Sequence, residues 1–236
     1  MIGKIVVITG ANRGLGFAMS EKLASMGALV IMGCRDLKKG QEAANKLISR
    51  GLKVKAMQVD VGSTQSIDAF SESLKKDYAS IDVLINNAAI SDEPGGTVIE
   101  TIQLEYYRRI MDTNVLGTLW MCRNLQSFLK KSADGRIINF SSGLGQLTVP
   151  RMGPCPSYSI SKTAVNAITK ILADEVKDTN ITVFSVDPGW VKTDLGGPDA
   201  MLEIPEGIDT PCWLASTNKS ELISGEFYKE RKILGW

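Results

Sequence analysis

Histidine is absent from all 236 residues of the chain. The side chain that most often moves protons near neutral pH is therefore missing. Serine–histidine and cysteine–histidine nucleophile systems are excluded, because both use an imidazole as the base. Any proton transfer has to use a carboxylate, a tyrosine, a lysine or a cysteine whose pKa is shifted.

Cysteine is scarce too, with four residues at positions 34, 122, 155 and 212 and no Cys-x-x-Cys pair. A zinc site would need carboxylates and widely scattered thiols, so we expect no metal. Small buried thiols in a reducing cytosol fit this pattern, and we expect a cytoplasmic protein. We see no signal peptide, because the opening apolar run is short, and no run long enough to span a bilayer.

Net charge is also small, at +1. Such a chain has no excess of positive charge to attract nucleic acid or an anionic membrane. We therefore expect neither of these partners and look for a small-molecule site.

The stretch from Ile5 to Gly16 reads IVVITGANRGLG. Its β-branched start predicts a strand buried on both faces of a parallel sheet. Gly10, Gly14 and Gly16 then form a turn that leads into a helix. A helix N-terminus offers unpaired N–H groups and a positive dipole end, and glycines let a diphosphate approach the backbone. The spacing differs from G-x-G-x-x-G, so a merely structural turn is the alternative at this point.

Strand-like and helix-like segments alternate along the rest of the chain. This alternation predicts βαβ units and one α/β domain over residues 1–236, with a doubly wound parallel sheet of about seven strands. Asn114 and Gly117 fall in the middle of one long helix, where both are poor helix formers, and we expect a kink or a close contact there. The expected strands are 5–8, 28–33, 53–61, 81–85, 135–140, 181–186 and 225–229, and the expected helices are 17–26, 37–50, 65–78, 105–131, 157–177 and 207–215.

Charged and polar residues follow two of these strands. Asp36 lies near the usual position of a ribose-binding acid, but it also precedes a helix that it could cap. Arg35, together with Arg13 in the glycine turn, would suit a 2′-phosphate and therefore NADP. Asn86 and Asn87 end another strand, where they would make polar contacts in a ligand crevice or simply form a turn.

Tyr158 and Lys162 are four residues apart on one predicted helix and share a face. A tyrosine hydroxyl with a pKa of about 10 is a poor acid at neutral pH. A nearby ammonium stabilises the phenolate and lowers that pKa, so Tyr158 would exchange a proton without histidine. The pair on its own also fits an ordinary amphipathic helix face.

Taken together, these motifs resemble the short-chain dehydrogenase/reductase family over nearly the whole chain, and their surroundings look like its NADPH-dependent carbonyl reductase branch. The resemblance implies a single-domain Rossmann fold and hydride transfer between NADP(H) and a carbonyl or secondary alcohol. The matching motifs are Thr9-Gly10-x-x-x-Gly14-x-Gly16, Asp60, Asn86-Asn87-Ala88, Asn114, Ser142, Tyr158-x-x-x-Lys162 and Pro188-Gly189.

The resemblance also implies residue roles. Tyr158 would protonate the carbonyl oxygen, and Ser142 would hydrogen-bond the same oxygen. Lys162 would bind the nicotinamide ribose and lower the pKa of Tyr158, and Asn114 would hold a water that links Lys162 to solvent. The cofactor-binding set would be Gly10, Asn12, Arg13, Gly14, Leu15, Gly16, Arg35, Asp60, Val61, Asn87, Ala88, Tyr158, Lys162, Pro188, Gly189, Val191 and Thr193.

The chain departs from the family pattern in two places. Ala89 replaces the usual glycine, and its methyl group would narrow the space beside the cofactor. Ser142 and Tyr158 are sixteen residues apart, more than is usual, and a proline-containing loop can absorb the extra length. The segment 195–206, where the family places its substrate lid, is short, so we expect an open pocket and permissive carbonyl selection.

Two alternative functions remain compatible with the sequence, and the oligomeric state is also open. One is an alcohol or sugar dehydrogenase that prefers NAD. Another is a binding protein that senses NADP(H) without catalysis, because the same fold hosts both functions. A homodimer, a homotetramer and a monomer are all compatible with the sequence.

Overall fold

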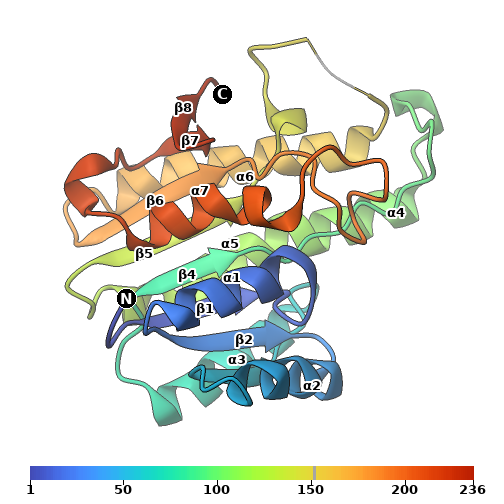
Figure 1. Cartoon of the computed structure of the whole chain (residues 1–236). Coiled ribbons are helices and arrows are strands. Elements are labelled where there is room, and N and C mark those ends of the chain that lie inside the picture. The colour runs from blue at the N-terminus through green and yellow to red at the C-terminus, as the bar shows by residue number, and fades with distance from the viewer. Residues whose placement is uncertain (151–152) are drawn as a thin grey trace.

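Parallel strands with helices on both faces make up the fold of the computed structural model, which describes residues 1–150 and 153–236 (Figure 1). The described residues form one sheet of eight strands in the order β3-β2-β1-β4-β5-β6-β7-β8. Every pairing is parallel except that of β7 with β8. The strands are β1 (Ile5–Thr9), β2 (Leu29–Cys34), β3 (Val54–Gln58), β4 (Val83–Asn86), β5 (Gly135–Phe140), β6 (Ile181–Val186), β7 (Glu226–Lys229) and β8 (Lys232–Leu234).

Two apolar layers hold helices against the two faces of this sheet. One layer packs α1, α2 and α7 on one face, and the other packs α3, α5 and α6 on the opposite face. No helix among the described residues is both long and apolar enough to cross a membrane. The helices are α1 (Gly14–Ser25), α2 (Leu37–Ile48), α3 (Thr64–Asp77), α4 (Leu104–Ile110), α5 (Gly117–Leu129), α6 (Pro156–Glu175) and α7 (Ile204–Ser216).

Strands β4, β5 and β6 are buried along their whole length. Burial on both faces explains why these strands read as continuous apolar runs rather than alternating patterns. The strand order reverses direction between β1 and β4, so the chain leaves these neighbouring strands toward opposite faces. Ligands of such sheets bind in the crevice at the carboxyl ends of the strands near this point.

The predicted doubly wound parallel sheet is confirmed, with two differences in detail. Strand β3 ends at Gln58, so Asp60 and Val61 lie in the loop beyond it. The eighth strand was not expected, because β8 is short, partly exposed and carries a lysine. The turn before it, Glu230-Arg231, has φ values of 50° and 59° without the glycine or asparagine that signals such a hairpin.

The long helix expected over residues 105–131 is interrupted. A π-helical turn, Met111–Leu116, separates α4 from α5 and contains Asn114. Gly117 follows directly, and a Cβ placed on it would lie 2.3 Å from the carbonyl oxygen of Val61. The expected close contact is therefore confirmed at Gly117, and a π-helical turn interrupts the helix at Asn114. Such π-turns are frequent at functional sites.

Gly117→Ala tests this close contact. The added methyl group meets the backbone of Val61, which cannot yield as a flexible side chain would, so we expect a loss of stability of roughly 1–3 kcal/mol. Urea unfolding measures it, with Gly95→Ala as the control because a Cβ there meets nothing within 4 Å. Equal stability of the two variants would contradict the role given to Gly117.

Candidate active site

The ends of β1 and β4 are joined by hydrogen bonds around the glycine turn. The Asn87 side-chain amide donates to the carbonyl oxygens of Thr9 at 2.8 Å and Gly10 at 3.3 Å. In return, the Thr9 hydroxyl accepts the N–H groups of Asn87 and Ala88 at 3.1 and 3.0 Å. The polar residues after β4 therefore fix the turn in which Gly10 has a φ of 65°.

The N-terminus of α1 faces this turn. Arg13 occupies the N-cap position, yet its side chain makes no capping hydrogen bond within the described chain. It forms an exposed ion pair with Asp194 instead. Gly16 packs so closely that a Cβ there would lie 2.4 Å from the Gly10 carbonyl oxygen. Positions 14 and 16 of the first turn carry no side chain, which fits the close approach of a phosphate group to the helix N-terminus.

The candidate residues for the adenosine end follow β2 and β3. The Asp36 side chain accepts the Lys39 N–H at 3.1 Å and caps α2, so the capping alternative is the one observed. Arg35, directly before it, is exposed. Asp60 accepts the N–H of Gly62 at 3.0 Å, which shapes the loop after β3.

Tyr158 and Lys162 lie on one face of α6 as predicted. The Lys162 Nζ atom lies 5.3 Å from the centroid of the Tyr158 ring. It also donates a hydrogen bond of 2.7 Å to the carbonyl oxygen of Phe140, the last residue of β5. Lys162 is 3% exposed. One buried amine therefore joins α6 to the end of the sheet.

Ser142 follows β5 and begins the short 3-10 helix Gly143–Gly145, with its hydroxyl accepting the Leu144 N–H at 3.2 Å. Its side chain also acts on Tyr158, where it lowers the pKa of the phenol. Gly145 allows this approach, because a Cβ there would lie 2.7 Å from the Lys162 carbonyl carbon. The long loop between Ser142 and Tyr158 leaves the two side chains together, and residues 151–152 of that loop lie outside the described residues.

Asn114 connects the segment after β4 to α6. Its Oδ1 accepts the Ile90 N–H at 2.9 Å, and its Nδ2 donates to the Ile90 carbonyl at 2.9 Å and to the Ser161 hydroxyl at 3.0 Å. Ser161 in turn donates to the Tyr158 carbonyl at 2.7 Å. The role of holding a water for Lys162 stays a prediction, whereas these contacts give Asn114 a reason to lie at the π-turn.

The Pro188-Gly189 segment follows β6 and forms a further part of the site. Gly189 has a φ of 79° and donates its N–H to Asp187 Oδ1 at 2.9 Å. A Cβ on Gly14 would lie 3.6 Å from Thr193, so this segment reaches the glycine turn. A cavity of about 320 Å³ opens beside Asp187 and Pro188, between α7 and the β7–β8 turn.

Burial dominates the electrostatics of the pair. Burial, followed by the nearby Asp187 carboxylate, raises the pKa of the Tyr158 phenol, and Ser142 only partly opposes this. Burial also lowers the pKa of Lys162 to about 7, against the raising effect of Asp187. Desolvation disfavours the charged form of both groups. The expectation that Lys162 lowers the pKa of Tyr158 stays a prediction.

Two acidic residues beside the pair were missed by sequence reasoning. Asp187 is 4% exposed, and Lys229 pairs with it at 3.2 Å. The position of Asp187 directly before the Pro188-Gly189 motif was the sequence signal that could have identified it as a site residue. Glu93 is 8% exposed and contacts the start of α6. No spacing rule connects it to a helix more than sixty residues away.

The lowered pKa of Lys162 makes stability depend on pH. Between about pH 7 and its ordinary pKa of 10.5, this lysine is protonated in the unfolded chain but not in the folded one. Stability therefore rises with pH across that window. From the lower to the upper end of this pH window, we expect the free energy of unfolding of the wild type to rise by on the order of several kcal/mol more than that of Lys162→Met. Urea unfolding without nucleotide measures this, with the exposed Lys131→Met as control; parallel curves for wild type and Lys162→Met would contradict it.

Comparisons with known proteins identify the family of this chain. Residues 4–200 match the family model described as short chain dehydrogenase. The chain is 30% identical over 276 residues to carbonyl reductase [NADPH] 1 of Mus musculus (98% of each chain covered), and 31% identical over 250 residues to the short-chain dehydrogenase anuI of Penicillium roqueforti (98% of this chain and 97% of that protein).

A solved structure extends the likeness to three dimensions. The crystal structure of NADPH-bound carbonyl reductase from chicken fatty liver is 28% identical, with a TM-score of 0.89 and complete coverage of both chains. With a family model over most of the chain and matches that span it almost completely, the chain belongs to the short-chain dehydrogenase family and is similar to its carbonyl reductases.

Proposed function

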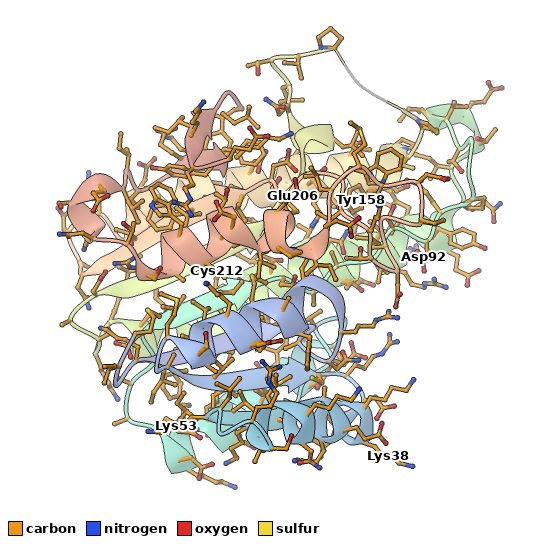
Figure 2. All side chains as sticks on the ribbon, viewed as in Figure 1. Lys38, Lys53, Asp92, Tyr158, Glu206 and Cys212 are labelled. Atoms are coloured by element: carbon orange, nitrogen blue, oxygen red, sulfur yellow. The ribbon has the colours of Figure 1, made fainter. Side chains whose placement is uncertain are left out.

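We propose that this protein is an NADP(H)-dependent carbonyl reductase that interconverts a carbonyl compound and a secondary alcohol. The observation that carries the proposal is the meeting of three side chains at the carboxyl ends of the strands. The Lys162 Nζ atom lies 5.3 Å from the centroid of the Tyr158 ring, and the Ser142 side chain lowers the pKa of the Tyr158 phenol. Figure 2 shows Tyr158 above the same end of the sheet at which the glycine turn lies.

The proposed mechanism divides the work between cofactor and protein. When bound, NADPH supplies the hydride, and the side chains supply positioning and charge. Tyr158 gives its phenolic proton to the substrate oxygen, and the Ser142 hydroxyl donates a hydrogen bond to that oxygen as negative charge develops. Lys162, held by its bond to the Phe140 carbonyl at 2.7 Å, stabilises the phenolate that Tyr158 leaves behind.

The glycine turn fits the pyrophosphate of NADP(H). The uncapped N-terminus of α1 and the glycine backbone at residues 10, 14 and 16 would hold phosphate oxygens. Asp36 is already engaged as the cap of α2, which argues against its use as the ribose-binding acid of an NAD enzyme. Arg13 and the exposed Arg35 would take the 2′-phosphate. Curated relatives named carbonyl reductase [NADPH] 1 support the same cofactor.

Tyr158→Phe tests the mechanism. Loss of the hydroxyl removes the proton donor, so we expect NADPH-dependent turnover of carbonyl compounds to fall by about 10²- to 10⁴-fold while NADPH still binds. Loss of the reduced nicotinamide absorbance, followed over a panel of aldehydes, ketones and quinones, measures turnover. Tyr78→Phe is a matched control, because Lys55 lies 5.8 Å from that ring as well. Wild-type turnover by Tyr158→Phe would remove the mechanism.

Arg35→Asp tests the cofactor. It replaces a charge-assisted bond to the 2′-phosphate with repulsion, so NADPH binding should weaken by about 1–3 kcal/mol and NADH binding should improve. Dissociation constants from nicotinamide fluorescence measure both. Lys131→Asp changes the net charge equally at an exposed position just after the C-terminal end of α5 and controls for general electrostatics. A wild-type preference for NADH would refute the assignment of NADP(H).

A further inference from the structure

The first turn of the catalytic helix α6 is held by a side chain from a distant loop. Glu93, in the segment after β4, accepts the N–H of Tyr158 at 3.1 Å and the N–H of Ser157 at 3.3 Å, one with each carboxylate oxygen. Glu93 is 8% exposed, and Ser157 is fully buried. The contact therefore joins two segments inside the protein rather than on its surface.

The helix needs a partner at this position. The first N–H groups of any helix have no acceptor within it. Pro156, the first helical residue, has no N–H, and the first backbone bond within the turn runs from Ser159 N to the Cys155 carbonyl at 3.0 Å. The N–H groups of Ser157 and Tyr158 lie between these positions, and Glu93 accepts both. Its negative charge also lies at the positive end of the helix dipole.

The carbonyl side of Tyr158 is held by the same part of the chain. The Ser161 hydroxyl donates to the Tyr158 carbonyl at 2.7 Å and accepts from Asn114 at 3.0 Å. Asn114 in turn binds both backbone groups of Ile90. The segment from Ile90 to Glu93 therefore reaches the Tyr158 backbone at its N–H directly and at its carbonyl through two side chains.

The neighbouring acid does not share this contact. Asp92 forms an ion pair with Arg109, close to α4, and its side chain is 35% exposed. In Figure 2, Asp92 and Tyr158 lie toward the same end of the molecule. Glu93 follows Asp92 directly in the chain. Two consecutive carboxylates thus bind different elements, and Glu93 is the one that binds the catalytic helix.

We propose that Glu93 is a positioning residue for carbonyl reduction, because its carboxylate fixes the first turn of α6 and thereby sets where the Tyr158 hydroxyl lies relative to Ser142 and Lys162. Glu93 acts through the backbone of Tyr158 and touches no reacting atom. The inference rests on the proposed function, in which Tyr158 is the proton donor.

Three variants test the inference: Glu93→Ala, Glu93→Gln and, as a control, Glu100→Ala, which removes an exposed acid from the same loop. Misplacement of Tyr158 should lower kcat of Glu93→Ala roughly ten- to a hundredfold. Glu93→Gln should lose less, because its single amide oxygen still accepts one N–H. The Kd for NADPH should change by less than about twofold, since only the reacting geometry is disturbed.

Hydrogen exchange gives a readout that does not depend on turnover. In Glu93→Ala, the Ser157 and Tyr158 amides should exchange at least about tenfold faster than in the wild type, while the later turns of α6 stay protected. In Glu93→Gln the acceleration should be smaller, because one of the two N–H groups keeps its acceptor. If Glu93→Ala does not fold, Glu93→Gln carries the same comparison at smaller amplitude.

The inference is overturned if the Glu93 variants match Glu100→Ala in kcat, or if their kcat and NADPH affinity fall together as in a general loss of structure. Tyr158→Phe, assayed in parallel, separates this failure from that of the proposed function. Turnover retained by Tyr158→Phe would refute the function itself, whereas an inactive Tyr158→Phe beside fully active Glu93 variants would refute only the role of Glu93.

Discussion

The Lys162 amine donates to the Phe140 carbonyl while it lies over the Tyr158 ring, so one side chain joins the end of β5 to the start of α6. Placing an amine there is costly, because desolvation disfavours its charge and lowers its pKa to about 7. The buried Asp187 carboxylate opposes that effect. Burial and the Asp187 carboxylate therefore act on the pKa of this amine in opposite directions, and burial has the larger effect.

Other contacts of the site fix the position of the Lys162 amine relative to the Tyr158 phenol. Gly145 lets the loop after β5 pack directly against α6 at Lys162. Asn114 lies in the π-turn and hydrogen-bonds both the segment after β4 and α6. Helix α6 is thus held between two strand ends, and Glu93 accepts two N–H groups of its first turn.

Features with a local cause were predictable from the sequence. Continuous apolar runs identify the buried strands, and the poor helix formers Asn114 and Gly117 mark the π-turn and the close contact with Val61. Features that depend on distant partners were not. Strand β8 needs β7 beside it, Glu93 needs the start of α6, and the raised pKa of Tyr158 depends on burial. The resemblance to a family identified which residues meet, but not the charge balance among them.

The exposed pair between Arg13 and Asp194 bears on the proposed cofactor preference. Such a pair competes with a 2′-phosphate for the same guanidinium. Exposed ion pairs contribute about 0–1 kcal/mol, whereas a hydrogen bond to a charged group contributes about 1.5–3 kcal/mol. A phosphate that engages Arg13 and Arg35 together therefore displaces Asp194 at small cost. NADH lacks this phosphate and leaves the pair intact, so the Arg13–Asp194 pair subtracts only its own small contribution from the discrimination between the two nucleotides.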